Sequence, residues 1–200
     1  MSASFERRIA RIGSALSALR DRLEPLGYVF ADAGAVLPGP SRAVEQVLAA
    51  IERRVGPVPL AYSTFQRRVG AVNFLGRPPW TGGGDPDPVM VYPIEEALRE
   101  LEEFEQDRQG YSAAFGGFRI PISPDAIGKE GASGGMWYGI AVPSPGDDPP
   151  LLEEPHQTSF LSYLELAIEW GGFPGLESAE GWHDWPIDTL IRDLHPPESE

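Results

Sequence analysis

Apolar residues recur at helical spacing in five stretches of the chain. The clearest stretch begins near Thr158 and ends at Gly171. Its apolar side chains stand at positions i, i+3, i+4, i+7 and i+8, which form one face of an α-helix: Phe160, Tyr163, Leu164, Ala167 and Ile168. Thr158 or Ser159 can cap its start, and Gly171 can take the left-handed conformation that closes a helix. The same periodicity predicts four earlier helices, over Ser4–Glu24, Ser41–Val55, Pro59–Val69 and Pro93–Gln109.

Short runs with the character of β-strands lie between and after these helices. In Phe118–Ile122 every second residue is apolar, which is typical of a half-buried strand. The other predicted strands are Tyr28–Ala31, Val72–Leu75, Val89–Tyr92 and Trp137–Val142. Short glycine-rich connections at 116–117 and 128–135 favour antiparallel pairing. We therefore expect an α+β fold, with a mostly antiparallel sheet and helices packed on one face.

A length of 200 residues suits one domain with extensions. We expect an N-terminal helix and linker over residues 1–39, a main domain over residues 40–176 and a tail over residues 177–200 that packs on the domain. Five apolar tail residues could make that contact: Trp182, Trp185, Ile187, Leu190 and Ile191. In the N-terminal helix, apolar residues spaced by four and three indicate packing within the chain, and an intermolecular helix pair is the alternative.

Three segments carry a family resemblance. Residues 158–176, TSFLSYLELAIEWGGFPGL, resemble the C-terminal helix and GGFPG turn of the Smi/Knr-like domains, the SUKH superfamily. Residues 122–143, ISPDAIGKEGASGGMWYGIAVP, are similar to that family's "PD…K…SGG…Y.I..P" block, and residues 59–76, PLAYSTFQRRVGAVNFLG, are similar to its early helix. The first 40 residues and the tail from Trp182 to Glu200 match nothing in the family.

The resemblance implies an α+β binding domain. Many members of the family are immunity proteins that neutralise a toxin encoded by a neighbouring gene, and others are regulatory binding modules. The resemblance supplies no catalytic residue set, so we expect a protein that is not an enzyme. An immunity protein is the first expectation, and a regulatory protein-interaction module not linked to a toxin is the alternative.

Charge is distributed unevenly along the chain. The formal net charge is −14, which divides into +4 for residues 1–70 and −18 for residues 71–200. Such an acidic field repels phosphates, so we expect no nucleic-acid partner, and it attracts a basic protein. Solubility alone is the other interpretation of the charge. The chain has no cysteine, no apolar run long enough to span a membrane and no signal-peptide pattern, so we expect a cytoplasmic protein without membrane contact.

The expected partner is a basic toxin, for example a nuclease, which an acidic surface would occlude. Acidic candidates for the contact lie on the helix predicted after Pro93 and in the proline-rich loop after Pro143: Glu102, Glu103, Asp147, Asp148, Glu153 and Glu154. Trp80 and Trp137 lie next to glycine- and proline-rich loops and could supply apolar contacts, because tryptophan is enriched at interface hot spots. Burial in the core is the alternative for both tryptophans.

Motifs that could carry chemistry are weak. Residues 131–135, GASGG, match the G-x-S-x-G nucleophile elbow around Ser133, but a strand-like segment follows where that motif needs a helix. His156, His183 and His195 lack metal-ligand spacing, and Asp85 and Asp87 form only a fragment of a calcium loop. We therefore expect no metal and no cofactor. Asp125 and Lys129, four residues apart, are predicted to form an ion pair that shapes their loop.

Overall fold

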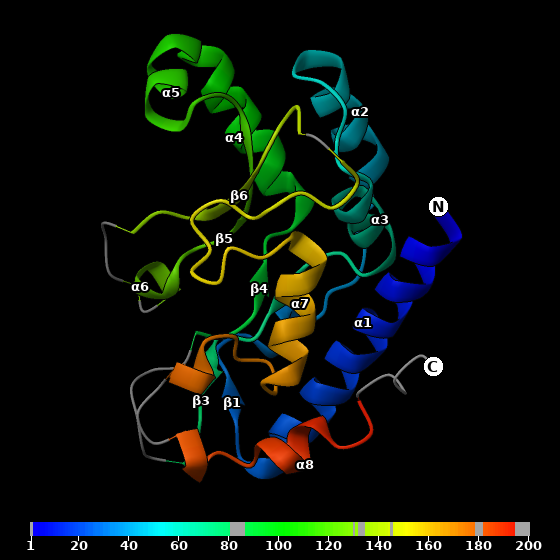
Figure 1. The fold of residues 1–200 in the computed structure, drawn as a ribbon, viewed down its shortest axis with the longest axis vertical. Coiled ribbons are helices and arrows are strands. Elements are labelled where there is room, and N and C mark those ends of the chain that lie inside the picture. Colours follow the sequence, from blue (N-terminus) through cyan, green and yellow to red (C-terminus); the bar gives the residue numbers. More distant parts are fainter. Residues whose placement is uncertain are drawn as a thin grey trace.

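The structure is a computed structural model that describes residues 2–80, 87–129, 131, 135–144, 146–178 and 182–194. Within these residues the helices are α1 (Ser2–Leu23), α2 (Val44–Arg54), α3 (Leu60–Arg68), α4 (Ile94–Gln106), α5 (Arg108–Phe115), α6 (Ala126–Lys129), α7 (Phe160–Glu169) and α8 (Ile187–Ile191). The strands are β1 (Val29–Phe30), β2 (Val72–Asn73), β3 (Gly76–Arg77), β4 (Met90–Val91), β5 (Arg119–Ser123) and β6 (Tyr138–Ala141). Helices α2, α4 and α5 gather at one end of the molecule, and β1, β3 and α8 lie at the other (Figure 1).

The described strands form small antiparallel ladders. β1 pairs with β3, β2 with β4 and β5 with β6. The Tyr92 N–H donates to the Ile122 carbonyl at 2.7 Å and so links the end of β4 to β5. The register of β5 on β6 shifts between Pro121 and Ser123, where proline has no N–H to donate. The α+β class is therefore confirmed, but the ladders have two strands each instead of forming one sheet.

The helix predicted over Pro93–Gln109 is in fact two helices. α4 ends at Gln106, and Asp107 leaves the helical conformation with φ −141° and ψ 71°. Its carboxylate accepts a hydrogen bond from the Gly110 N–H at 2.9 Å and so caps α5. Gly116, with φ +77°, then closes α5. The break exists because the Asp107 side chain competes with the helix for backbone donors.

Helix α7 follows the sequence pattern closely. Ser159 caps its start by accepting from the Ser162 N–H, and Gly171 has φ +66° just after its end. The Phe160 ring lies edge-on to Phe65 and Tyr62, with centroids 5.3 Å and 5.8 Å away. These contacts join α7 to α3 in the centre of the core.

One hydrophobic core includes both ends of the described chain. α1 contributes fully buried side chains along its inner face: Ile9, Ile12, Leu16, Leu19 and Leu23. Trp185, Ile187 and Leu190 of the tail are also buried, and the ring of Trp185 lies 4.8 Å from that of Phe173. Described residues before residue 40 and after residue 176 therefore pack into the same core as the segment between them.

Ion pairs connect the basic N-terminal part to the acidic remainder. Arg8 of α1 binds both carboxylate oxygens of Glu165 on α7, at 2.6 Å and 2.5 Å. Arg54 of α2 pairs with Glu105 of α4 at 3.0 Å. Arg22 donates to the backbone carbonyls of Leu190 and Arg192, both at 2.6 Å, and so ties α8 to α1. Several arginine charges of the first 70 residues are therefore used inside the molecule.

Candidate functional site

The outer face of α4 carries acidic side chains without cationic partners. Glu102 and Glu103 are exposed, and no described cation lies within 4.0 Å of either carboxylate. Their neighbours differ, because Glu96 pairs with Arg99 and Glu105 pairs with Arg54. Consecutive helix residues point about 100° apart, so Glu102 and Glu103 present negative charge on two sides of the exposed face. This pair is the exposed acidic site.

The two aspartates of the proline-rich loop hold helix ends instead. The carboxylate of Asp148 accepts from Ser159 Oγ at 2.8 Å and from the Leu161 N–H at 3.1 Å, at the start of α7. Arg8 Nη1 lies 3.5 Å from the same carboxylate. The backbone carbonyl of Asp147 accepts from the Ala61 N–H at 2.8 Å, at the start of α3. These residues join the loop to the starts of α3 and α7, and Asp148 also approaches α1.

Glu153 and Glu154 are adjacent but have different surroundings. Glu153 is exposed and pairs with Arg119 of β5 at 3.2 Å. Glu154 is only 3% exposed and accepts from the N–H groups of His156 and Thr158. Burial opposes ionisation of Glu154, but the hydrogen bonds from Thr158 and His156 outweigh it and lower the pKa of the carboxyl. Glu154 therefore stabilises its own loop and has almost no contact with solvent.

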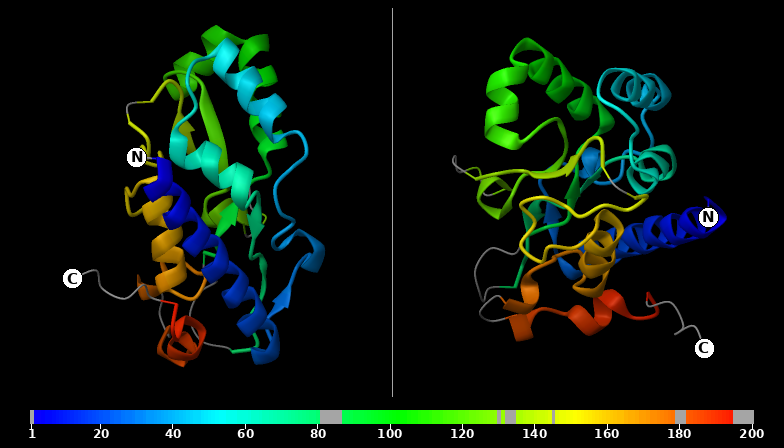
Figure 2. Two further views of the ribbon diagram at one scale, coloured as in Figure 1. Left: turned by 90° about the vertical axis from the view of Figure 1, so that its right-hand side faces the viewer. Right: turned by 45° about the horizontal axis from the view of Figure 1, so that its top comes forward.

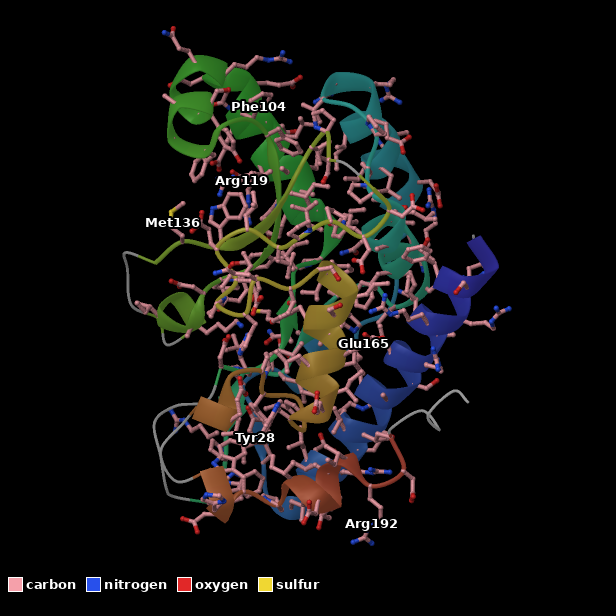
Figure 3. All side chains as sticks on the ribbon, viewed as in Figure 1. Tyr28, Phe104, Arg119, Met136, Glu165 and Arg192 are labelled. Carbon is pink, nitrogen blue, oxygen red and sulfur yellow. The ribbon has the colours of Figure 1, made fainter. Side chains whose placement is uncertain are left out.

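The two candidate tryptophans also differ. Trp137 is half-buried against Phe115 of α5, with ring centroids 5.6 Å apart. The guanidinium of Arg119 lies over the same Phe115 ring, 5.5 Å from its centroid. Met136 is 41% exposed and points outward beside this group (Figure 3). Trp80 instead is half-buried against the core and packs on Trp185 of the tail, with ring centroids 5.1 Å apart.

Trp137, Phe115, Arg119 and Met136 form what we call the aromatic patch. Tryptophan, phenylalanine, methionine and arginine are the side chains most enriched in the centres of protein interfaces. The patch lies under α5, next to the end of the molecule that carries α4 (Figures 1 and 3). Of its members the sequence indicated only Trp137. Phe115, Arg119 and Met136 escaped notice because their contacts depend on the unexpected helix α5.

A buried ion pair joins α6 to the segment before β4. Lys129 Nζ donates to Asp87 Oδ1 at 2.5 Å, and the Lys129 side chain is 2% exposed. The Tyr138 hydroxyl donates to Asp87 Oδ2 at 3.1 Å, and Lys129 Nζ lies 5.2 Å from the centre of the Tyr138 ring. Burial raises the pKa of Asp87 and lowers the pKa of Lys129, although each charge attracts the other. The group joins the chain before β4, α6 and β6.

The prediction that Lys129 pairs with Asp125 is therefore wrong, because the ion pair of Lys129 is with Asp87. Asp125 Oδ1 accepts from the Gly128 N–H at 2.8 Å and so starts α6. Its charge raises the pKa of Lys129 only from a distance, after the stronger effects of burial and of Asp87. The sequence indicates Asp87 only as part of a calcium-loop fragment, because nothing local connects it to a lysine 42 residues later.

Three other expectations concern metals, catalysis and membranes. Ser133, Asp85 and His195 lie outside the described residues. Across the described ranges, no group of three or more histidine, aspartate or glutamate side chains is placed to hold a metal ion. No helix in the same ranges is long and apolar enough to cross a membrane.

His156 forms a clasp between two segments. Its Nδ1 lies 2.6 Å from Glu154 Oε1, and its Nε2 lies 2.8 Å from Glu177 Oε1. Burial opposes protonation of the ring, but the two carboxylates outweigh it and raise the pKa of His156 above its usual 6.5. The protonated ring donates to both carboxylates and ties the loop after β6 to the turn that begins the tail.

We expect this clasp to make stability depend on pH. Because the folded-state pKa of His156 is raised, its contribution is complete below pH 6.5 and is lost as pH rises through the folded-state pKa. His156→Ala should therefore lower the free energy of unfolding by about 0.5–1 kcal/mol at pH 6 and by close to nothing at pH 9. The effect at pH 6 is small because solvent screens the charge of this partly exposed group. Urea denaturation of both proteins at the two pH values measures the difference. An equal cost at both pH values would contradict the charged clasp.

Comparison with known proteins finds no match: no family model, no curated protein and no solved structure matches this chain. The resemblance to the SUKH superfamily therefore remains an expectation from the sequence. Function has to be argued from the exposed acidic site and the aromatic patch.

Proposed function

We propose that this protein is a non-enzymatic protein-binding domain, an immunity protein of the SUKH type that acts in the cytoplasm. Its partner is a cognate toxin with a basic surface, such as a nuclease. The acidic surface covers the toxin's active site and thereby blocks its substrate. No cofactor takes part.

The observation that carries the proposal is the placement of unpaired charge. Arg8, Arg22 and Arg54 are held by acids or carbonyls inside the fold. Glu102 and Glu103, in contrast, face solvent with no described cation within 4.0 Å. Part of the excess negative charge is thus displayed outward on α4. Such a field attracts a basic partner over roughly a Debye length, about 10 Å at 0.1 M salt.

Charge alone does not hold a complex together for long. Electrostatic complementarity mainly raises the association rate, whereas desolvated apolar and aromatic contacts lower the dissociation rate. The aromatic patch can supply those contacts beside the exposed acidic site. In this arrangement Glu102 and Glu103 steer the partner, and Trp137 and Met136 are covered in the complex.

A pair of charge variants tests the proposal. The purified protein is immobilised, and basic proteins of the source cells are captured at low salt. Glu102→Gln with Glu103→Gln should slow association of the captured protein about tenfold at low salt and much less at high salt, because the steering field is screened. The matched control is Asp184→Asn with Asp188→Asn. It removes two negative charges as well, from exposed side chains at and just before α8, at the end of the molecule opposite α4.

The outcomes separate the two family roles. If the captured protein stops growth when expressed alone and co-expression of this chain restores growth, the immunity role is supported. A captured partner that is harmless to cells would favour the regulatory binding module. Equal association rates for the α4 variant and the control would contradict the placement of the binding surface on α4.

A further inference from the structure

α1 has an outer face that is unlike the rest of the helix. Its inner face is buried, whereas the side that points away from the core carries Arg7, Ala10, Ser14, Ala18 and Asp21. Three of these are small, and four are exposed, with Ala18 half-buried. We call these five residues the outer face of α1. Seen from the side, α1 runs across the surface with α7 on one flank and α3 on the other (Figure 2).

Two hollows flank the outer face. The first, of about 820 Å³, lies between α1 and α7, and the second, of about 480 Å³, lies between α1 and α3. Ala10 and Ser14 line both hollows, so the centre of the outer face is a low ridge between them. A second helix laid across this ridge could place its larger side chains in the hollows, as in ridge-into-groove packing.

The charges of the outer face are complementary to themselves. Arg7 and Ala10 lie seven and four residues before Ser14, and Ala18 and Asp21 lie four and seven residues after it. A twofold axis through Ser14, with the two helices antiparallel, would place Ser14 opposite Ser14, Ala10 opposite Ala18 and Arg7 opposite Asp21. The contact between Arg7 and Asp21 therefore occurs twice, once at each end, as an isologous interface requires.

We propose that two copies of this chain associate through the outer face of α1 as an antiparallel, twofold-symmetric pair. The occupant of the hollows is thus a second copy of α1. This inference does not rest on the proposed function, because the exposed acidic site lies on α4, away from α1 (Figures 1 and 2).

The polar groups of the outer face are suited to such contact. Ser14 Oγ already donates to the Ala10 carbonyl at 3.0 Å, so covering it leaves no donor without a partner. Arg20 binds Asp21 Oδ1 at 2.8 Å, which leaves Oδ2 for the arginine of another copy. Arg7 is exposed, and no described acid lies within 4.0 Å of it. Arg7 of one copy can therefore pair with Asp21 of the other at each end of the helix pair.

A single cysteine gives the sharpest test, because the natural chain has none. In Ser14→Cys the two new thiols would face each other across the axis, within the Cα separation of 4.4–6.8 Å or so that a disulfide needs. Mild oxidation should convert most of this variant into a covalent dimer at concentrations where the wild type is in monomer–dimer equilibrium by analytical ultracentrifugation. The control is Ser112→Cys, exposed on α5, which should remain largely monomeric.

Charge exchange tests the antiparallel register. Arg7→Glu and Asp21→Arg should each raise the dimer dissociation constant about tenfold, because each change turns both symmetric contacts repulsive. An equimolar mixture of the two variants should form a heterodimer with the wild-type constant, since Glu faces Arg at one end and Asp faces Arg at the other. The double variant in one chain should also recover.

Two results would overturn the proposal. One is a wild type that stays monomeric up to high micromolar concentration, with no cross-linking of Ser14→Cys. The other is a wild-type dimer in which Ser112→Cys cross-links as well as Ser14→Cys, or in which mixing the two charge variants restores nothing. Circular dichroism of each variant checks that the fold is retained.

Discussion

Replacing Lys129 with methionine should lower the free energy of unfolding by about 3–5 kcal/mol near pH 7. The methionine side chain fills a similar volume, but it leaves Asp87 with a charge that is shielded from water and has no counter-ion. Tyr138 would be the one remaining side-chain donor to that carboxylate among the described residues. Urea denaturation of wild type and variant measures the loss.

The control and the pH dependence identify the cause. Arg99→Met removes an exposed cation that pairs with Glu96 one helical turn away, and it should cost no more than about 0.5 kcal/mol. In Lys129→Met the pKa of Asp87, already raised by burial, should rise further because the attracting charge is gone. A raised carboxyl pKa favours the folded state as pH falls, so the cost should shrink toward pH 5.

A double variant completes the test of the pair. Combining Lys129→Met with Asp87→Leu removes both buried charges, and it should recover most of the lost stability, because buried ion pairs contribute little beyond apolar residues of similar size. Additive losses in the double variant, or a loss below about 1 kcal/mol for Lys129→Met alone, would show that the two side chains do not depend on each other.

Gly70→Ala should be the other strongly destabilising change, at about 3 kcal/mol or more. Gly70 follows the C-cap of α3 and has φ +85°, which alone costs an alanine about 1–2 kcal/mol. An added Cβ would also lie 2.2 Å from the Gly39 carbonyl oxygen and 2.5 Å from its carbon. Both atoms belong to backbone, so the chain around the bridge between Gly39 and Ala71 would have to move.

Gly116→Ala is the matched control for this prediction. Gly116 has a similar φ of +77°, but nothing lies within 4 Å of its added Cβ. It should cost only the conformational penalty, about 1 kcal/mol. Thermal or urea denaturation of the two variants gives the comparison directly. Equal losses would mean that the close approach of residues 39 and 70 does not constrain the fold.

The helices that could be predicted are those whose information is local. α7 has an apolar face, a serine cap and a closing glycine within a few residues of one another, and all three occur in the structure. α1 has an equally regular seam, which is buried as its periodicity indicates. The boundary inside Pro93–Gln109 was missed, because Asp107 ends one helix with its backbone and starts the next with its side chain.

The candidate site was harder to predict, because contacts between distant segments decide it. Six acids looked equivalent in the sequence, yet Asp148 caps α7, Glu154 holds its own loop, and Glu102 faces solvent. The ion pair of Asp87 with Lys129 could not be predicted from sequence spacing, because the two residues are 42 positions apart. The spacing of four residues favours Asp125 as the partner of Lys129 instead. Which charges remain available to a partner depends on which ones the fold has already used.

The place of α1 in the core has a consequence for synthesis of the protein. α1 is made first among the described helices and α3 follows early, but the α7 and α8 residues that cover the rest of its inner face are made last. At about 5–20 residues per second, its row of isoleucines and leucines waits on the order of ten seconds for those partners. During that interval the nascent chain exposes the part of the apolar face of α1 that α7 and α8 later cover, and such surface is prone to aggregation before folding is complete.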